Sequence, residues 1–158
     1  MTCGGKYDSG NCVSDILREI ADAQSDLLND CVTSCEQSIA DLLGDTSPSN
    51  NLDTVPVILY CKGTCKPFKG YGVPADDLGD AFASFYFRVK SVDKDNCAVL
   101  ELLREEDDHG KDHKDHNQKD PRSPVQQNTS DLEVTGVCIT VDLDCFCHIT
   151  CLPAISAF

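Results

Sequence analysis

The sequence contains no tryptophan, a single methionine, and only 13 basic residues against 27 acidic ones. Its net charge of −14 argues against the basic surfaces by which proteins bind nucleic acids or anionic membranes. No apolar run approaches the ~18 residues of a membrane-spanning helix. We therefore expect neither nucleic acid nor membrane among the partners of this chain.

Motifs of the common catalytic sites are also missing. The chain has no GxSxG, no phosphate-binding loop, no HExxH pair, and no CxxC of a thiol oxidoreductase. With many cysteines present, no pattern selects one Cys–His pair as a nucleophile and its base. We therefore predict that the protein is not an enzyme and holds no cofactor.

Cysteine, by contrast, is abundant, with 11 among 158 residues. This usage is close to that of a disulfide scaffold, and the odd number leaves at least one thiol for a partner or a metal. Residues 1–6 show neither the basic nor the apolar region of a signal peptide, so we expect synthesis in a cytoplasm. Because a cytoplasm normally keeps thiols reduced, so many cysteines need a chemical explanation.

Composition divides the chain into parts. Acidic, helix-like sequence gives way to β-rich sequence after a linker at 45–53. Residues 105–131 carry eight acids, four bases and no aromatic residue, so we expect a solvated loop with nothing to bury. The parts are a flexible N-terminal arm (1–10), a helical segment (11–44), a β domain with this polar loop (54–152), and a short apolar tail (153–158) that we expect to pack on a neighbour.

The expected fold class is α+β: two N-terminal helices followed by an antiparallel β-sandwich or curled β-sheet. Apolar residues at three- and four-residue spacings predict a helix over 12–30, with Asn11 as its N-cap. Thr33, followed by Glu36, predicts the start of a second helix. Gly44 is a natural end for that helix.

Alternation of apolar and polar residues predicts the strands. We expect strands at 55–61, 83–90 and 97–104, the last two forming a hairpin through a turn at 93–96. Within 83–90, we expect Phe85, Phe87 and Val89 on the inner face and Tyr86, Arg88 and Lys90 on the outer face.

The most informative stretch is 137–152, which alternates twice. In its first half, Val137, Ile139, Val141 and Leu143 would share one face of a strand; after a turn, Cys145, Cys147, Ile149 and Cys151 would share another. A face made mostly of thiols is an unusual way to build a core. It predicts a pair of closing strands whose cysteines have a chemical role.

A zinc site is one alternative for these thiols. The available soft ligands are Cys61, Cys65, Cys145, Cys147 and Cys151. Zinc knuckles normally use a CxxC spacing, which the chain lacks, and this argues against structural zinc.

The histidines offer two further alternatives. His109, His113 and His116 lie four and three residues apart, which fits either a solvated loop or a weak metal site. His148, flanked by cysteines, is either exposed or placed to lower the pKa of a nearby thiol.

Several segments together resemble the spore coat protein Y/Z family, which includes related exosporium proteins of Bacillus-type bacteria. The similarity covers nearly the whole chain except 105–131, and its last motif is the most specific. The segments are Cys3; Asn11-Cys12-Val13; Cys31 with Ser34-Cys35; Val55-Pro56 with Leu59-Tyr60; Ser84-Phe85-Tyr86-Phe87-Arg88-Val89; Cys97-Ala98 with Leu100, Leu103 and Arg104; and Cys138-Ile139, Val141-Asp142-Leu143, Cys145-Phe146-Cys147, Ile149 and Cys151-Leu152.

The resemblance implies a structural protein made in the mother-cell cytoplasm. It implies self-assembly of hexameric rings into a hexagonal sheet at the spore surface, in the outer coat, crust or exosporium, cross-linked by disulfides and resistant to heat and detergent. Its partners would be other copies of itself and other coat or exosporium proteins. A cysteine-rich metal-binding or thiol-redox domain remains the alternative.

Nine cysteines are candidates for disulfides or cross-links. Cys3 and Cys12 are candidates between subunits, because a thiol near a mobile terminus reaches a neighbour with little strain. Those in the closing strands are expected to be packed, bonded within the subunit, or placed at a contact between subunits. The full set is Cys3, Cys12, Cys31, Cys35, Cys97, Cys138, Cys145, Cys147 and Cys151.

Overall fold

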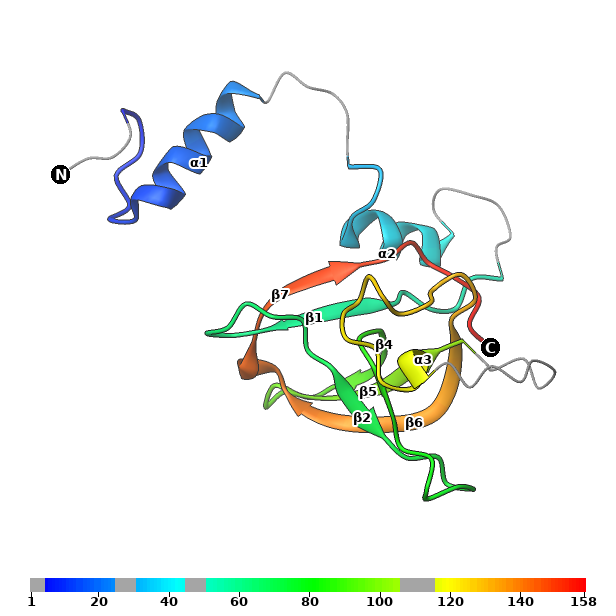
Figure 1. Ribbon diagram of the computed structural model, residues 1–158. Helices are drawn as coiled ribbons and strands as arrows, with labels where there is room; N and C mark the ends of the chain where they lie inside the picture. The colour runs from blue at the N-terminus through cyan, green and yellow to red at the C-terminus, as the bar shows by residue number, and fades with distance from the viewer. Residues whose placement is uncertain (1–4, 25–30, 45–50, 106–115) are drawn as a thin grey trace. The chain divides into compact units, whose positions relative to one another are not determined.

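The computed structural model describes residues 5–24, 31–44, 51–105 and 116–158 (Figure 1). Two helices precede a mostly antiparallel set of strands, so the α+β class is confirmed. The chain forms two compact units, Met1–Cys31 and Val32–Phe158. Within the described ranges, no helix has the length and apolar character needed to cross a membrane.

The first unit is built around helix α1 (Cys12–Ala23). The Asn11 side chain accepts a hydrogen bond from the Ser14 amide at 3.0 Å, so the expected N-cap is confirmed. The helix ends at Ala23, earlier than predicted, and 25–30 lie outside the described residues.

Residues 5–10 pack on α1 and differ from the free arm that we expected. The Ser9 hydroxyl donates to the carboxylate of Asp15 at 2.6 Å, and the Lys6 amide donates to Glu19 at 2.6 Å. The Tyr7 hydroxyl donates to Asp22, which also pairs with the Lys6 ammonium. Polar groups near the N-terminus are therefore satisfied by acids of the helix.

Helix α2 (Cys35–Leu43) begins the second unit. Its N-cap is Ser34, whose hydroxyl accepts from the Gln37 amide at 3.0 Å, so the prediction of Thr33 was wrong by one residue. Ser34 and Gln37 have the same three-residue spacing as a capping box, which explains the error. Gly44 ends the helix with a φ of 78°, as expected, because glycine adopts this left-handed conformation without strain.

Five antiparallel strands form the main sheet of this unit (Figure 1). The two outer strands are consecutive in sequence and are joined only by the short 3₁₀ helix η1 (Leu143–Cys145). In spatial order the strands are β6 (Glu133–Asp142), β5 (Cys97–Arg104), β4 (Phe87–Val92), β1 (Val57–Cys61) and β7 (Phe146–Cys151).

One face of the sheet packs against a separate pair of strands, β2 (Gly70–Gly72) and β3 (Phe82–Ser84). A Cβ atom at Gly70 would lie 2.8 Å from the ring of Phe87, so only glycine allows this close approach. The core on this face is formed by Val57, Leu59, Phe82, Phe87, Ala98, Leu100 and Leu102; Val137, Ile139, Val141 and Leu143 pack against it, as their alternation predicted.

The predicted strand at 83–90 is broken at Phe85 and Tyr86, both of which are buried. The Ser84 hydroxyl accepts from the Tyr86 amide at 3.0 Å and donates to the Leu103 carbonyl at 2.6 Å. This side chain replaces ladder hydrogen bonds and ends the strand locally. The strict alternation that we expected was therefore wrong: Tyr86 is buried, and Val89 is 43% exposed. The hairpin through 93–96 and the strand from Cys97 to Arg104 are confirmed.

The second half of the polar loop is not solvated throughout, because it packs on the break between β3 and β4. Pro121 and Gln127 are buried, and helix α3 (His116–Lys119) precedes them. The Gln127 amide accepts from the Phe85 backbone N–H at 2.9 Å and donates to the Ser84 hydroxyl at 2.9 Å. A single polar side chain thus satisfies groups at the break between β3 and β4, which composition alone did not indicate.

Replacing Gln127 with alanine should lower the free energy of unfolding by about 2 kcal/mol, because the buried Phe85 amide would lose its partner. Urea denaturation followed by circular dichroism measures this loss. The matched control is Asn128→Ala, at an exposed neighbouring position. Equal stability of the two variants would contradict this role of Gln127.

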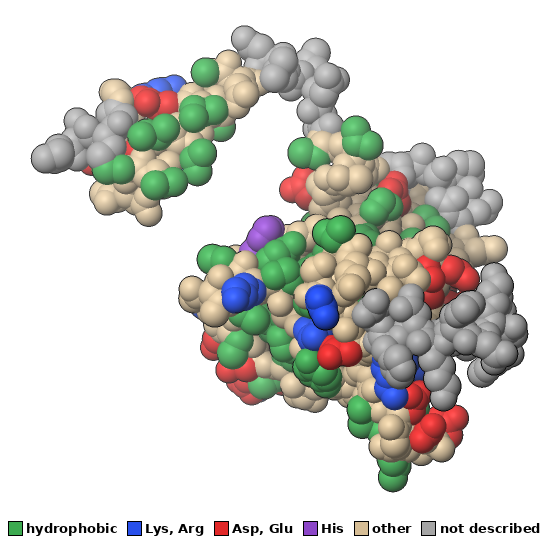
Figure 2. Space-filling view, viewed as in Figure 1, with side chains coloured by type: hydrophobic (Ala, Val, Ile, Leu, Met, Phe, Trp, Pro, Cys, Tyr) green, Lys and Arg blue, Asp and Glu red, His purple; other side chains and the backbone are tan. Residues whose placement is uncertain are grey.

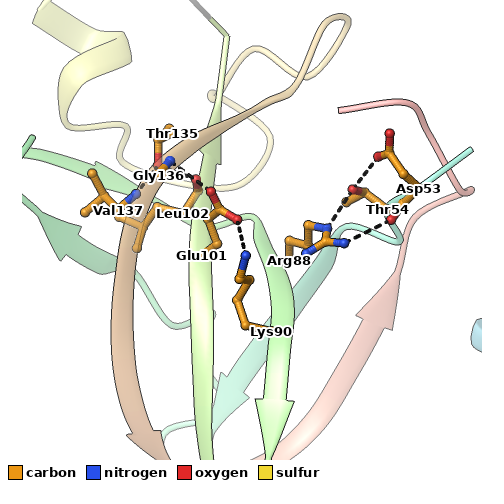
Figure 3. A network of polar contacts seen from close by, with 9 residues as sticks. All are labelled: Asp53, Thr54, Arg88, Lys90, Glu101, Leu102, Thr135, Gly136 and Val137. Carbon is orange, nitrogen blue, oxygen red and sulfur yellow. Dashed lines mark hydrogen bonds and ion pairs between the residues drawn. The ribbon is translucent and has the colours of Figure 1, made fainter. Parts of the chain in front are cut away.

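Hydrogen bonds within the second unit hold the C-terminal tail. Ala157 is buried, and its carbonyl accepts from the Val134 amide at 2.9 Å. Its own amide donates to the carboxylate of Asp53 at 2.9 Å. The Thr54 hydroxyl donates to the same carboxylate and accepts from Arg88 (Figure 3).

Partial burial alone would raise the pKa of Asp53, but hydrogen bonds from Ala157 and Thr54, with Arg88 nearby, hold this pKa below its usual value. Because the pKa of Asp53 is lower in the folded chain, its carboxylate stabilises the fold at pH values above the unfolded pKa of about 3.9. This contribution disappears as the pH falls through the pKa of the folded state. Asp53→Asn should therefore cost about 1 kcal/mol at neutral pH and progressively less below about pH 4. Urea denaturation at several pH values measures this loss in the free energy of unfolding, with Asp76→Asn at an exposed position as the control. A loss that did not change with pH would contradict the role of the Asp53 carboxylate.

A second polar network lies in the sheet itself (Figure 3). Glu101 is 3% exposed, and its carboxylate accepts from the Gly136 amide at 2.8 Å. The Lys90 ammonium lies 3.6 Å from the other carboxylate oxygen. The pair lies on strands β4 and β5, so a buried charge is balanced across neighbouring strands.

Candidate functional site

A disulfide links the two ends of the second unit's sequence. Cys35, the first residue of α2, is bonded to Cys151, the last residue of β7, across 116 residues of sequence. The Ser38 hydroxyl donates to the Leu152 carbonyl at 2.7 Å beside it. These two contacts attach α2 to the outer strand of the sheet.

The other cysteines of the second unit remain thiols, and most are exposed. Cys61 is half-buried, whereas Cys65, Cys97, Cys138, Cys145 and Cys147 are exposed. The expected face of Cys145, Cys147, Ile149 and Cys151 is divided in the structure: Cys145 belongs to η1, Cys151 is in the disulfide, and Ile149 is 48% exposed. Accessible thiols of this kind are available for chemistry outside the subunit.

Five of these six thiols surround η1, and we call them the thiol end. Cys61 ends β1, and its carbonyl accepts from the Cys65 amide at 3.0 Å and lies 3.6 Å from the Cys147 sulfur. The Lys62 amide donates to the Cys145 carbonyl at 2.8 Å. Cys97 pairs in register with the last residue of β6, directly before η1. The β1 turn, η1 and the β4–β5 hairpin therefore meet at one end of the sheet (Figure 1).

Cys61 and Cys65 were not among the cross-linking cysteines predicted from the sequence. The missing information was the pairing of β1 with β7, which aligns Tyr60 with His148 and brings the β1 turn beside η1. Alternation along a strand identifies its faces but not its neighbour in the sheet. Cys138 lies opposite Glu101 in the ladder, away from η1.

The zinc alternative loses one of its ligands, because a thiol bonded to Cys35 cannot bind metal as a thiolate. Within the described part of the chain, no three His, Cys, Asp or Glu side chains lie close enough to hold a metal ion. His109 and His113 lie outside the described residues, and His116 begins α3. His148 is exposed and stacks on the Tyr60 ring with centroids 4.2 Å apart.

The N-terminal cysteines differ among themselves. Cys3 lies outside the described residues, and Cys12 is disulfide-bonded. Because a cross-link to a neighbour requires a free thiol, the bonded Cys12 is not available for one in this state. Cys31 is an exposed thiol.

Helix α1 has an exposed apolar side (Figure 2). Val13 and Leu17 are 67% and 58% exposed, and Ile16 and Ile20 are exposed as well. Val13 and Leu17 help line a shallow hollow of about 450 Å³ together with Ala21. The first unit therefore leaves the apolar stripe predicted for this helix uncovered within itself.

Comparison with known proteins gives this set of exposed thiols a context. The family model described as spore coat protein Z matches residues 1–154. The chain belongs to the spore coat protein Z family. It is 36% identical over 146 residues to spore coat protein Z of Bacillus subtilis (strain 168), covering 91% of this chain and 90% of that relative. No solved structure matches it significantly.

Membership of the spore coat protein Z family confirms the family predicted from the sequence and assigns the chain a structural role in the spore coat.

Proposed function

We propose that this chain assembles with copies of itself into a hexagonal, disulfide-cross-linked sheet in the outer layers of the spore. The single observation that carries this proposal is the group of accessible thiols on the second unit, which take no part in its internal disulfide. A protein that kept its cysteines only for its own fold would pair or bury them.

A hexagonal sheet requires two kinds of contact between subunits. One heterologous contact, repeated by rotation, closes a ring, and a second contact joins neighbouring rings. Disulfides across both contacts convert a non-covalent lattice into a covalent network, which fails only when several bonds break together. The curled form of the sheet predicted above would suit such a tile, because consecutive outer strands joined by η1 bring the two sheet edges together at one end.

The proposal includes the place and the partners of the protein. The chain would be made in the mother cell, would act in the outer coat, crust or exosporium, and would bind other coat proteins in addition to its own copies. The exposed apolar side of α1 supports contacts beyond the subunit, because an apolar stripe of this kind is normally covered.

Electron microscopy of the protein expressed alone, in a host that makes no spores, tests this function. We expect extended sheets whose image transforms have sixfold symmetry. A monomer of uniform size at all concentrations, in reducing and oxidising buffer alike, would refute the proposal. A metal assay on the same sample addresses the alternative, since a metal-binding domain would carry stoichiometric zinc.

A further inference from the structure

We infer that the thiol end is the surface by which one subunit is cross-linked to a second copy of this chain, with the two thiol ends facing each other across a twofold axis. The inference rests on the proposed function and specifies which face of the subunit makes one of its contacts. Its residues are Cys61, Cys65, Cys97, Cys145 and Cys147.

The position of the thiols is the first argument. They come from three segments far apart in sequence, which the fold brings to one end of the sheet through the hydrogen bonds around η1. Within the described residues, no three potential ligands converge as a metal would require. Four of the five thiols are exposed and Cys61 is half-buried. Thiols that are gathered at one end, mostly exposed, and not arranged around a common centre are suited to react with thiols of another molecule.

The charges beside these thiols are the second argument, because they identify the partner. Lys62 and Lys66 are exposed in the turn after β1. In the β4–β5 turn and along the adjoining part of η1, the exposed acids outnumber Lys94 of that turn; they are Asp93, Asp95, Asp142 and Asp144. Backbone hydrogen bonds position the basic turn and the acidic hairpin against η1. The Lys62 amide donates to the Cys145 carbonyl, and the Leu143 amide donates to the Asn96 carbonyl in the acidic hairpin at 2.8 Å.

A surface with a basic half and an acidic half is complementary to its own copy after a twofold rotation. The basic turn of one subunit then faces the acidic hairpin of the other, twice in the same contact. This contact is isologous and so joins subunits in pairs, which suits a junction between neighbouring rings rather than the closure of one ring.

The bond itself forms by thiol–disulfide exchange with a low-molecular-weight disulfide as the oxidant. A thiolate of one copy attacks this disulfide and releases one small thiol. A thiolate of the second copy then attacks the mixed disulfide, forms the bond between the copies, and releases the second small thiol. Each cross-link therefore oxidises two cysteines and reduces one molecule of oxidant.

Isotope mixing identifies such bonds directly. Equal amounts of unlabelled and ¹⁵N-labelled protein are mixed while reduced, oxidised with glutathione disulfide, and analysed as disulfide-linked peptides by mass spectrometry. We expect peptide pairs from the thiol end to carry both isotopes in half of the cases. The bond between Cys35 and Cys151 is the internal control and should never mix isotopes. If every disulfide-linked peptide pair from the thiol end carried a single isotope, the inference would be overturned. An internal bond between Cys61 and Cys147 would give that result.

Charge variants test the twofold arrangement. Lys62→Glu with Lys66→Glu makes both halves acidic, and Asp95→Lys with Asp144→Lys makes the acidic half basic. Each variant alone should lose cross-linked dimer at least tenfold, whereas a mixture of the two should restore it as a mixed dimer. Cys138→Ser, which removes a thiol outside this end, should leave cross-linking unchanged. Equal cross-linking by either charge variant alone would contradict the twofold contact.

Electron microscopy of the same oxidised samples separates the two proposals. A sixfold sheet without mixed-isotope bonds at the thiol end would overturn this inference and leave the proposed function standing. Mixed-isotope dimers without any sheet would support the thiol end as an interface and count against the lattice.

Discussion

The double change Cys35→Ser and Cys151→Ser should lower the free energy of unfolding of the oxidised chain by about 4 kcal/mol. The bond joins residues 116 positions apart, so in the unfolded chain it restricts a long loop. In the chain-entropy model, the cost of closing a loop rises slowly with its length, which places this bond toward the upper end of the usual range. Because the bond also attaches α2 to β7, we expect the helix to separate from the sheet before the strands unfold.

Circular dichroism in urea measures this effect on dilute protein, since the chain has no tryptophan to report by fluorescence. The comparison is made with and without reductant, because a reduced native chain should be no more stable than the double variant. Cys138→Ser is the matched control, since it removes an exposed thiol that has no disulfide. Equal stability of the native chain and the double variant under oxidising conditions would contradict this account.

Replacing the five cysteines of the thiol end with serine should remove the covalent links between neighbouring rings. Oxidised native protein should give a ladder of high-mass bands on a non-reducing gel, and the variant should lose the bands larger than a single ring at least tenfold. The physical reason is that a network whose rings are joined through one face separates when the bonds of that face are absent. The internal disulfide, by contrast, remains intact in this variant.

The gel is read against two controls. Cys138→Ser tests whether any exposed thiol has the same effect, and reductant applied to the native protein gives the fully separated state. A variant ladder as strong as the native one would show that the cross-links lie elsewhere, for example at Cys3 or Cys31.

Local features of the fold could be predicted from the sequence because they depend on neighbouring residues. Asn11 as an N-cap, Gly44 as a helix end, and the hairpin before Cys97 all follow from short-range chemistry. The packing face of Val137 and its alternating neighbours follows from the two-residue period of a strand. The family, too, was recognisable from the sequence, by the resemblance of segments spread over most of the chain.

Features that depend on distant partners could not be predicted in the same way. Gln127 looked like part of a solvated loop, yet it satisfies the Phe85 amide 42 residues away. The pairing of Cys35 with Cys151 and the grouping of thiols around η1 require the strand order, which alternation does not specify. Sequence therefore identified the chemistry of this protein, and only the fold assigned that chemistry to particular ends of the sheet.

The central claim is that this chain alone builds a sheet held together by disulfides. The most direct test is electron microscopy of sheets from protein expressed alone, imaged after boiling in detergent with and without reductant. We predict that sixfold order survives boiling in the absence of reductant and disappears when reductant is present. Protein that remains monomeric under every condition, or sheets whose survival is the same with reductant, would contradict the account.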